Sequence, residues 1–248
     1  MRSSLGARFW RIWVAAGVST LGDGVREVAL PLLAVTVTRD PALVAAVSVA
    51  GRLPWLLLSL VSGALVDRLD RRRVMGTVDV VRAGIVLSLA LAVAVGLTSV
   101  ALLCIIAFAL GTGETLFDNA AQAIMPSVVR RDQLESANSR LYAAQVASFE
   151  FVGPPLGALL FATAAEVPFV VDGVSFAVAA LVLTMAGSYR PVRPAGPPAR
   201  LRAEIVEGLR WLWNHRPLRT LGLMLGVWNL LTTGSSACSS CSRSRRWG

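Results

Sequence analysis

The sequence is dominated by mostly apolar runs of about 20 residues, the length that an α-helix needs to cross the hydrocarbon core of a bilayer. Hydrophobic residues make up 55% of the 248 positions and charged residues only 16%. Six such runs follow one another and a seventh begins at Leu218; the six are residues 12–36, 42–66, 74–96, 99–123, 139–162 and 167–187. The pattern predicts an all-α membrane protein with six complete transmembrane helices and a partial seventh.

One stretch, residues 83–113, carries no charge and is long enough to be either one helix or a hairpin of two. The turn-forming residues Gly96, Thr98 and Ser99 favour the hairpin. With six helices, all arginine-rich connections fall on one side of the membrane and only Arg39 falls on the other. Because short cytoplasmic loops are enriched in basic residues, we expect a plasma-membrane protein with both ends of the bundle cytoplasmic.

The formal net charge is +9, which in a soluble chain would indicate a nucleic-acid partner. Here the arginines lie in clusters between apolar runs, so membrane topology accounts for them and we expect a lipid bilayer and no nucleic acid. The pair Cys238 and Cys241 has no second pair of ligands at metal-site spacing. We therefore expect neither a metal nor a cofactor.

The chain divides into four predicted segments. Residues 1–188 form the six-helix bundle. A proline-containing basic segment follows, and we expect a cytoplasmic linker at 189–217 that includes an amphipathic helix. Residues 218–233 begin the seventh transmembrane helix, and residues 234–248 form a tail of different composition.

The connection after the second run reads GALVDRLDRRR, from Gly63 to Arg73. Glycine permits close helix packing, Asp67 can meet a helix amino terminus, and Arg68, Arg71 and Arg72 can bind carbonyl groups at helix ends. The same residues could also be an ordinary positive-inside cluster. The segment resembles the GxxxDRxGRR signature of the major facilitator superfamily, with an aspartate, Asp70, at the second glycine. The resemblance implies a loop that takes part in conformational switching, in which Asp118 also participates.

Further segments resemble the superfamily branch that contains enterobactin-exporter-like proteins and macrolide or multidrug efflux proteins. They are Leu21 to Gly24, Asp79 to Arg82, Phe117 to Ala120, and Gly153 to Gly157. The last, with Gly153, Pro154 and Gly157, resembles the end of the helix-bending motif of drug antiporters. The resemblance covers residues 10 to about 233 and implies the amino-terminal half of a two-half fold, with the carboxyl-terminal half missing.

Four ionisable residues lie deep within the predicted helices. At about 1.5 Å per residue, Asp23, Arg52, Glu114 and Glu150 each lie roughly 15–20 Å from the outer end of their predicted helix. Such groups are costly in a bilayer and mark transport pathways or ion pairs. Since the resemblance places the first and fourth helices beside a central cavity, these four are candidates for substrate or proton coupling.

Pairing between helices is the alternative role for the buried charges. The pairs to expect are Asp23 with Arg26 or Arg52, Asp79 with Arg82 near the cytoplasmic end, and Asp118 with the arginines of the loop. On the fourth helix, the polar residues share one face, which must line a cavity or meet another polar helix. This face consists of Gly111, Glu114, Thr115, Asp118 and Gln122.

The sequence therefore predicts a secondary transporter that exports a small molecule, such as a drug or a siderophore, in exchange for protons. The alternatives are a half-transporter that must dimerise and a truncated product without activity. An intramembrane enzyme is not expected, because the single histidine, His215, lies in the linker. Asp67 and Asp70 are also three positions apart, which does not fit a phosphatidyltransferase.

The tail has a separate interpretation. The seventh run, Leu218 to Thr233, is shorter than a bilayer requires, and the residues that follow are rich in Ser, Cys and Arg. This change is what GC-rich codons for apolar residues would give when read out of frame. We expect a frameshift near Gly234, with a genuine polar tail as the alternative.

Overall fold

The computed structural model describes residues 5–185, together with residues 215, 217, 219, 220 and 224. The chain divides into two units, Met1–Ala195 and Gly196–Gly248. In the described part of the first unit the elements are helical throughout. They are α1 (Ala7–Val37), α2 (Pro41–Arg68), α3 (Arg71–Ala94), α4 (Val100–Val128), η1 (Arg131–Gln133), α5 (Leu134–Val146), η2 (Ala147–Val152), α6 (Gly153–Thr163) and α7 (Val167–Met185).

Short polar side chains begin α2 and α4. Asp40 accepts a hydrogen bond from the backbone N–H of Ala42 at 2.9 Å, and Ser99 accepts one from Leu102 at 3.3 Å. These caps satisfy amide groups that have no partner within the helix. Between α3 and α4, Gly96 has a φ of 71°, which glycine adopts without strain. The predicted hairpin at residues 83–113 is thus confirmed.

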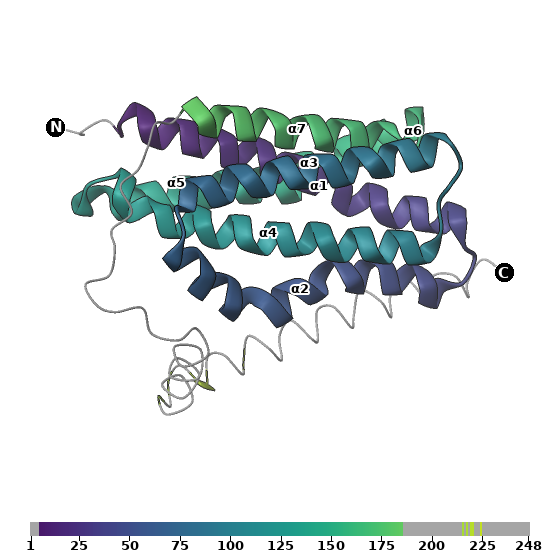
Figure 1. The fold of residues 1–248 in the computed structure, drawn as a ribbon, viewed down its shortest axis with the longest axis horizontal. Helices are drawn as coiled ribbons and strands as arrows, with labels where there is room; N and C mark the ends of the chain where they lie inside the picture. The colour runs from purple at the N-terminus through teal and green to yellow at the C-terminus, as the bar shows by residue number, and fades with distance from the viewer. Residues whose placement is uncertain (1–4, 186–214, 216, 218, 221–223, 225–248) are drawn as a thin grey trace. The chain divides into compact units, whose positions relative to one another are not determined.

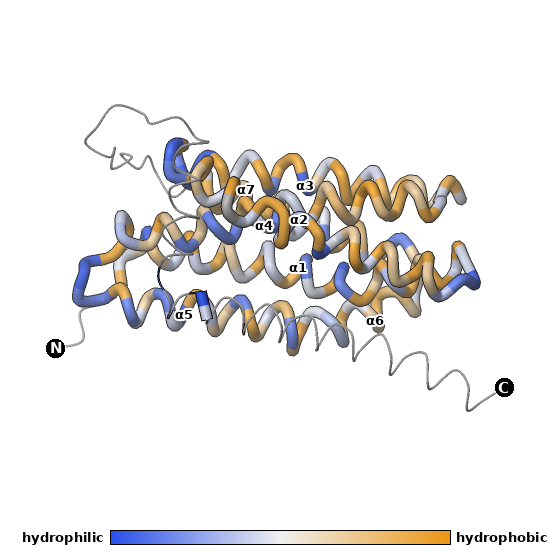
Figure 2. Tube along the Cα trace, turned by 90° about the horizontal axis from the view of Figure 1, so that it is seen from below, coloured by the Kyte–Doolittle hydropathy of each residue, from blue (hydrophilic) through white to orange (hydrophobic). Residues whose placement is uncertain are grey.

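Five helical stretches of the described residues are long and apolar enough to cross a membrane. They are Pro41–Ser59, Arg71–Ala94, Val100–Val128, Arg131–Thr163 and Val167–Met185. The α1 helix has 31 residues but carries Asp23, Arg26 and Glu27 at its middle. Asp23 and Arg26 are buried against other helices, so lipid does not have to solvate them. Figure 2 shows apolar residues along most of the long helices, whereas hydrophilic residues lie mainly at helix ends and along α5. The all-α membrane fold is confirmed.

The helices of the first unit run lengthwise beside one another (Figure 1). The α2 helix packs along α4, whereas α7 packs against both α1 and α3, and α6 packs against α1. The apolar core has two parts. One contains Phe9 and Ile124, and the other contains Leu89 and Phe169. On α1 and α3, the buried charged residues lie between these two parts, and on α4 the partly buried Glu114 does so.

The remaining predicted segments fall largely outside the described residues. This holds for the linker at 189–217, the seventh helix at 218–233 and the tail at 234–248. Of the seventh helix, residues 219, 220 and 224 are described, and all three are helical. The domain boundaries and the frameshift remain predictions.

Candidate functional site

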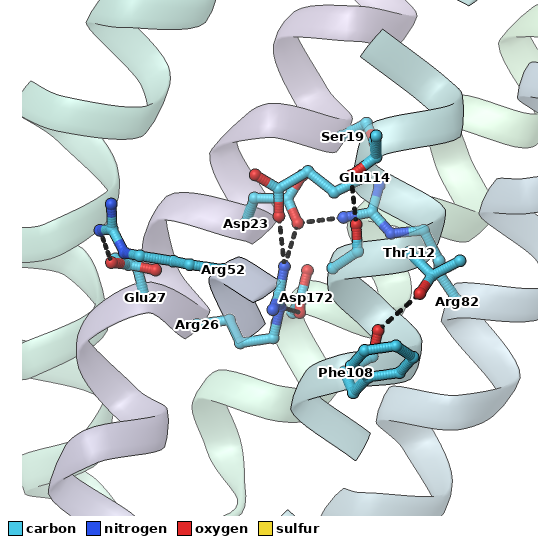
Figure 3. Close-up of polar contacts among 12 residues, drawn as sticks. Ser19, Asp23, Arg26, Glu27, Arg52, Arg82, Phe108, Thr112, Glu114 and Asp172 are labelled. Atoms are coloured by element: carbon cyan, nitrogen blue, oxygen red, sulfur yellow. Dashed lines mark hydrogen bonds and ion pairs between the residues drawn. The ribbon is translucent and has the colours of Figure 1, made fainter. Parts of the chain in front are cut away.

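Charged side chains from four helices meet at the middle of the bundle (Figure 3). We call this group the central charge cluster. Its members are Asp23 and Arg26 of α1, Asp79 and Arg82 of α3, Glu114 of α4 and Asp172 of α7. Six charged groups in the interior of a membrane helix bundle are expensive unless they neutralise one another. Their arrangement therefore determines what the site can do.

Asp23 is the acceptor that both arginines share. Its Oδ1 accepts hydrogen bonds from Nη2 of Arg26 and from Nη2 of Arg82. Only 5% of the Asp23 side chain is exposed. Because charge-assisted hydrogen bonds are strong in a medium of low dielectric constant, Asp23 holds α1 and α3 together through Arg82.

Arg26 lies between three carboxylates. Besides Asp23, its Nη2 is 3.3 Å from Oε2 of Glu114, and its Nε is 3.2 Å from Oδ2 of Asp172. Glu114 differs from its neighbours because 36% of its side chain is exposed, whereas Asp172 is fully buried. Arg26 thus links a partly exposed carboxyl group with two buried ones.

Arg82 is among the largest fully buried side chains of the described chain. Its Nη1 is 3.7 Å from Oδ1 of Asp79, which also accepts a hydrogen bond from Ser19 at 3.1 Å. The guanidinium carbon lies 4.0 Å from the ring centroid of Phe176, a favourable cation–π distance. Sequence reasoning placed the Asp79–Arg82 pair near the cytoplasmic end of its helix; the structure corrects this, because Arg82 lies midway along α3.

Two glycines make room for these charged side chains. A Cβ atom at Gly113 would lie 2.7 Å from Cδ of Arg82. A Cβ atom at Gly22 would collide with Oδ1 of Asp172 and Oγ of Ser175. The α1 and α4 helices therefore need glycine at these positions to accept the arginine and the aspartate.

The structure brings two of the four coupling candidates together. Asp23 and Glu114 both contact Arg26. Arg52 lies apart from them and pairs instead with Glu27, in a contact where both side chains are substantially exposed. Glu150 is exposed in η2. Arg52 and Glu150 are thus outside the central charge cluster.

Asp172 is the cluster residue that sequence reasoning missed. It is the single charged residue among the 19 residues of α7. An isolated acid in such a helix indicates a buried partner. This signal was sufficient to predict that Asp172 is paired. The sequence could not have shown which helix supplies that partner.

No group of three or more His, Cys, Asp or Glu side chains among the described residues is arranged to hold a metal ion. The two guanidinium groups occupy the positions between the carboxylates that a cation would need. Of the four carboxyl groups in contact with these arginines, that of Glu114 is the most exposed.

The loop between α2 and α3 forms a second polar site at one end of the bundle. Nη2 of Arg71 lies 3.1 Å from Oδ1 of Asp67, and Nη2 of Arg72 donates to the carbonyl of Thr184, at the end of α7, at 3.4 Å. Asp70 caps α3, since its Oδ1 accepts from the amides of Arg72 and Arg73 at 3.1 and 3.2 Å. The aspartate at the superfamily's second glycine therefore begins the helix. Arg68, the remaining arginine of the motif, is exposed.

Of the motif residues, Gly63 lies within α2 and Asp118 lies within α4. A Cβ atom at Gly63 would meet nothing within 4 Å among the described residues, and the close helix approach expected there stays a prediction. The close approach of α2 to α4 occurs instead at Gly111, where a Cβ atom would collide with the carbonyl of Gly51. Asp118 accepts a hydrogen bond from Nε2 of Gln145 at 3.0 Å, which ties α4 to α5.

The fifth predicted helix changes form at the antiporter-like motif. It consists of α5, the π-helical turn η2 and α6, which begins at Gly153. Pro154 and Pro155 have no amide hydrogen, so regular α-helical bonds cannot continue across them. A Cβ atom at Gly153 would lie 2.6 Å from Cα of Gly24, and one at Gly157 would lie 3.1 Å from Cα of Val25. The irregular helix therefore crosses α1 in close backbone contact.

Comparison with known proteins agrees with this architecture. Residues 5–237 match a major facilitator family described as "Transmembrane secretion effector". The multidrug efflux pump Tap of Mycobacterium tuberculosis is 32% identical over 240 residues, and that of Mycolicibacterium fortuitum is 34% identical over 236 residues. Macrolide efflux protein A of Streptococcus pyogenes is 25% identical over 154 residues, which is 62% of this chain and 38% of that protein.

Each alignment with Tap covers 90% of this chain and 55% of the relative. The chain thus spans about half the length of these relatives. The family and the relatives are transport proteins rather than enzymes, and they work in a lipid bilayer on small molecules. With a family match over most of its length and a helical bundle of membrane-spanning segments, the chain belongs to the transmembrane secretion effector family of major facilitator transporters.

Proposed function

We propose that this chain forms the amino-terminal half of a proton-coupled exporter of small molecules in the plasma membrane. The observation that carries the proposal is the link made by Arg26, which contacts the partly exposed Glu114 and the buried Asp23 and Asp172. A group that binds at Glu114 changes the charge that Arg26 experiences. The effect then reaches carboxylates that solvent does not touch.

The proposed coupling follows from competition for one guanidinium group. While Glu114 is ionised, Arg26 is shared among three carboxyl groups, those of Asp23, Glu114 and Asp172. Neutralising Glu114, by a proton or by a cationic group of a substrate, removes one competitor and strengthens the contacts of Arg26 with Asp23 and Asp172. Because these residues lie on α1 and α7, the change alters how two helices are held. Alternating access requires such a link between occupancy and helix packing.

The names of the relatives support a drug-like substrate. Tap is a multidrug efflux pump and the streptococcal protein exports macrolides. The orientation proposed from the sequence, with both ends of the bundle cytoplasmic, is supported by the contacts at one end of the bundle. There the arginine-rich loop after α2 and the arginines at residues 130 and 131 after α4 lie at the same end, because α2 and α4 run in the same direction. Basic loops at one end are the expected arrangement for the cytoplasmic side.

Transport by membrane vesicles tests the proposal. The chain is expressed alone and also together with the carboxyl-terminal half of Tap, and uptake of a macrolide is measured with and without an imposed proton gradient. We expect gradient-driven transport from the combination. Transport by the chain alone would favour a dimer of halves, and absence of transport in both arms would contradict the proposal.

Variants locate the coupling groups in the same assay. We expect Asp23→Asn and Glu114→Gln each to reduce gradient-driven transport by tenfold or more, a change of about 1.4 kcal/mol or greater in barrier height. Glu135→Gln is the matched control, because Glu135 is exposed at the start of α5. Equal transport by all three variants would remove the cluster from the mechanism.

A further inference from the structure

The central charge cluster contains more acid than base. Asp23, Asp79, Glu114 and Asp172 are four carboxyl groups, and they face only two guanidinium groups, those of Arg26 and Arg82. If all six were ionised, the cluster would carry two uncompensated negative charges inside a membrane protein. A charge without a partner in such a medium is far more costly than a neutral acid. Two of the four carboxyl groups must therefore be neutral for the charges to balance.

Hydrogen bonding separates the four into two kinds. Asp23 accepts from both guanidinium groups, and Glu114 accepts from Nη2 of Arg26 at 3.3 Å. By contrast, neither oxygen of Asp172 and only one oxygen of Asp79 receives a hydrogen bond from the described residues. Both of these aspartates are fully buried. A buried ionised carboxylate requires several donors, and these two do not have them.

We propose that Asp79 and Asp172 each hold a proton in this conformation, whereas Asp23 and Glu114 are ionised. The charges then cancel, with two guanidinium groups facing two carboxylates. This assignment goes beyond the proposed function, because it places protons at rest on two residues that the coupling scheme does not require to ionise. It concerns the chain itself and can be tested without transport.

The contacts of Asp172 agree with a neutral acid. Nε of Arg26 lies 3.2 Å from its Oδ2, but neither atom has a hydrogen bond of acceptable geometry. A Cβ atom at Gly22 would collide with both Oδ1 of Asp172 and Oγ of Ser175, so these two oxygens are neighbours. The Ser175 hydroxyl already donates to the carbonyl of Asp172 at 2.7 Å. It is therefore not a donor to the carboxyl group, whose two oxygens receive no hydrogen bond from the described residues.

Asp79 presents a similar case on the other side of Asp23. Ser19 donates to its Oδ1 at 3.1 Å, a bond that the carbonyl oxygen of a neutral carboxyl group can accept. Nη1 of Arg82 is 3.7 Å away, which is beyond hydrogen-bonding range. The arginine directs Nη2 to Asp23 instead.

Both aspartates face charged groups on several helices. Around Asp172 these are Asp23 and Arg26 of α1, Arg82 of α3 and Glu114 of α4. Around Asp79 they are Asp23 of α1, Arg82 of its own helix and Asp172 of α7. The α6 helix contributes no titratable residue. Each aspartate therefore faces other acids as well as arginine.

Infrared spectroscopy of the purified 248-residue chain in lipid nanodiscs tests the assignment at neutral pH. A protonated carboxyl group has a carbonyl stretching band that an ionised one lacks, and the band shifts in heavy water. We expect Asp79→Asn and Asp172→Asn each to remove one such band. Asp23→Asn and Glu114→Gln should remove none. The control is Asp132→Asn, because Asp132 is exposed next to Arg130.

Retention of both bands in Asp79→Asn and Asp172→Asn, or loss of a band in Asp23→Asn, would overturn the proposal. Loss in only one of the two aspartate variants would overturn the assignment of the other. If the bands are found but the transport assay is negative, the inference stands and the proposed function fails. The two failures are thus distinguishable.

Thermal unfolding gives a second, independent measurement. Asparagine has the size and neutrality of a protonated aspartate, so Asp79→Asn and Asp172→Asn should leave the Tm close to that of the unmodified chain. Asp23→Asn removes the shared acceptor of two buried guanidinium groups and should lower the Tm by about 10 °C. A fall of that size in Asp79→Asn or Asp172→Asn, including failure to fold, would show that the residue is ionised.

Discussion

The two polar sites of the bundle use the same residue types in opposite surroundings. At the middle, Asp23 and Arg82 are buried and each has several partners. At the end, Asp67 pairs with Arg71, but 64% of the Asp67 side chain is exposed. Water can replace a lost partner at the loop and cannot do so in the cluster. Aspartate–arginine pairs of similar chemistry should therefore contribute very differently to folding and to transport.

The first prediction compares two arginines of α3. Arg82→Ala leaves Asp23 without one of its two donors in a buried site and should destabilise the chain by about 3–5 kcal/mol. Arg73→Ala is the matched control, since 84% of its side chain is exposed, and its effect should stay within about 0.5 kcal/mol. Unfolding of the purified chain, followed by helical circular dichroism, measures both. Equal effects would remove the distinction between the two sites.

The second prediction compares a glycine at the crossing of α1 and α6 with a glycine just before the loop. Gly153→Ala places a Cβ atom 2.6 Å from Cα of Gly24, so α1 and α6 must separate. Overpacking of this kind costs about 1–3 kcal/mol. Gly63→Ala, before the loop, meets nothing within 4 Å and should stabilise its helix by about 0.5–1 kcal/mol. A stabilising effect of Gly153→Ala would show that the crossing is looser than its geometry indicates.

The third prediction concerns the start of α3. Asp70→Ala removes the acceptor for the amides of Arg72 and Arg73 and should cost about 1 kcal/mol. Asp70→Asn keeps a capping oxygen and should retain most of the stability. A loss as large as that of Arg82→Ala would place the loop in the same energetic class as the cluster. Equal losses in the alanine and asparagine variants would instead assign the effect to charge.

Much of the fold was predictable because bilayer thickness and loop charge constrain it strongly. The hairpin around Gly96 followed from the distribution of arginines, and the structure places a positive φ there. Partner choice inside the bundle was less accessible, because a helix has several faces and the sequence does not say which helix each one meets. Arg52 illustrates this: its depth matched that of Asp23, but its side chain pairs with Glu27.

The site was predictable only in part for the same reason. Asp23 and Glu114 were selected as ionisable residues inside membrane helices, and both contact Arg26. Gly63 was assigned a packing role as the first glycine of the loop motif, whereas the close approach of α2 and α4 in the structure is at Gly51 and Gly111. Residue type and depth identify which groups need partners. Which residues become those partners depends on how the helices pack in three dimensions.

The smallest stability change belongs to Asp67, and it has the most direct bearing on the comparison. Its exposed pair with Arg71 contributes about 0–1 kcal/mol, so Asp67→Ala should fold almost normally. If the loop takes part in conformational switching, the variant should slow transport in the two-half assembly while substrate affinity stays constant, because the pair joins the ends of α2 and α3 far from Glu114. Rate and affinity are measured separately, by vesicle uptake and by equilibrium binding of the same macrolide. Weakened binding at an unchanged transport rate would identify a substrate site. If neither the rate nor the affinity changed, the role of the basic loop would be limited to setting the orientation of the helices in the membrane.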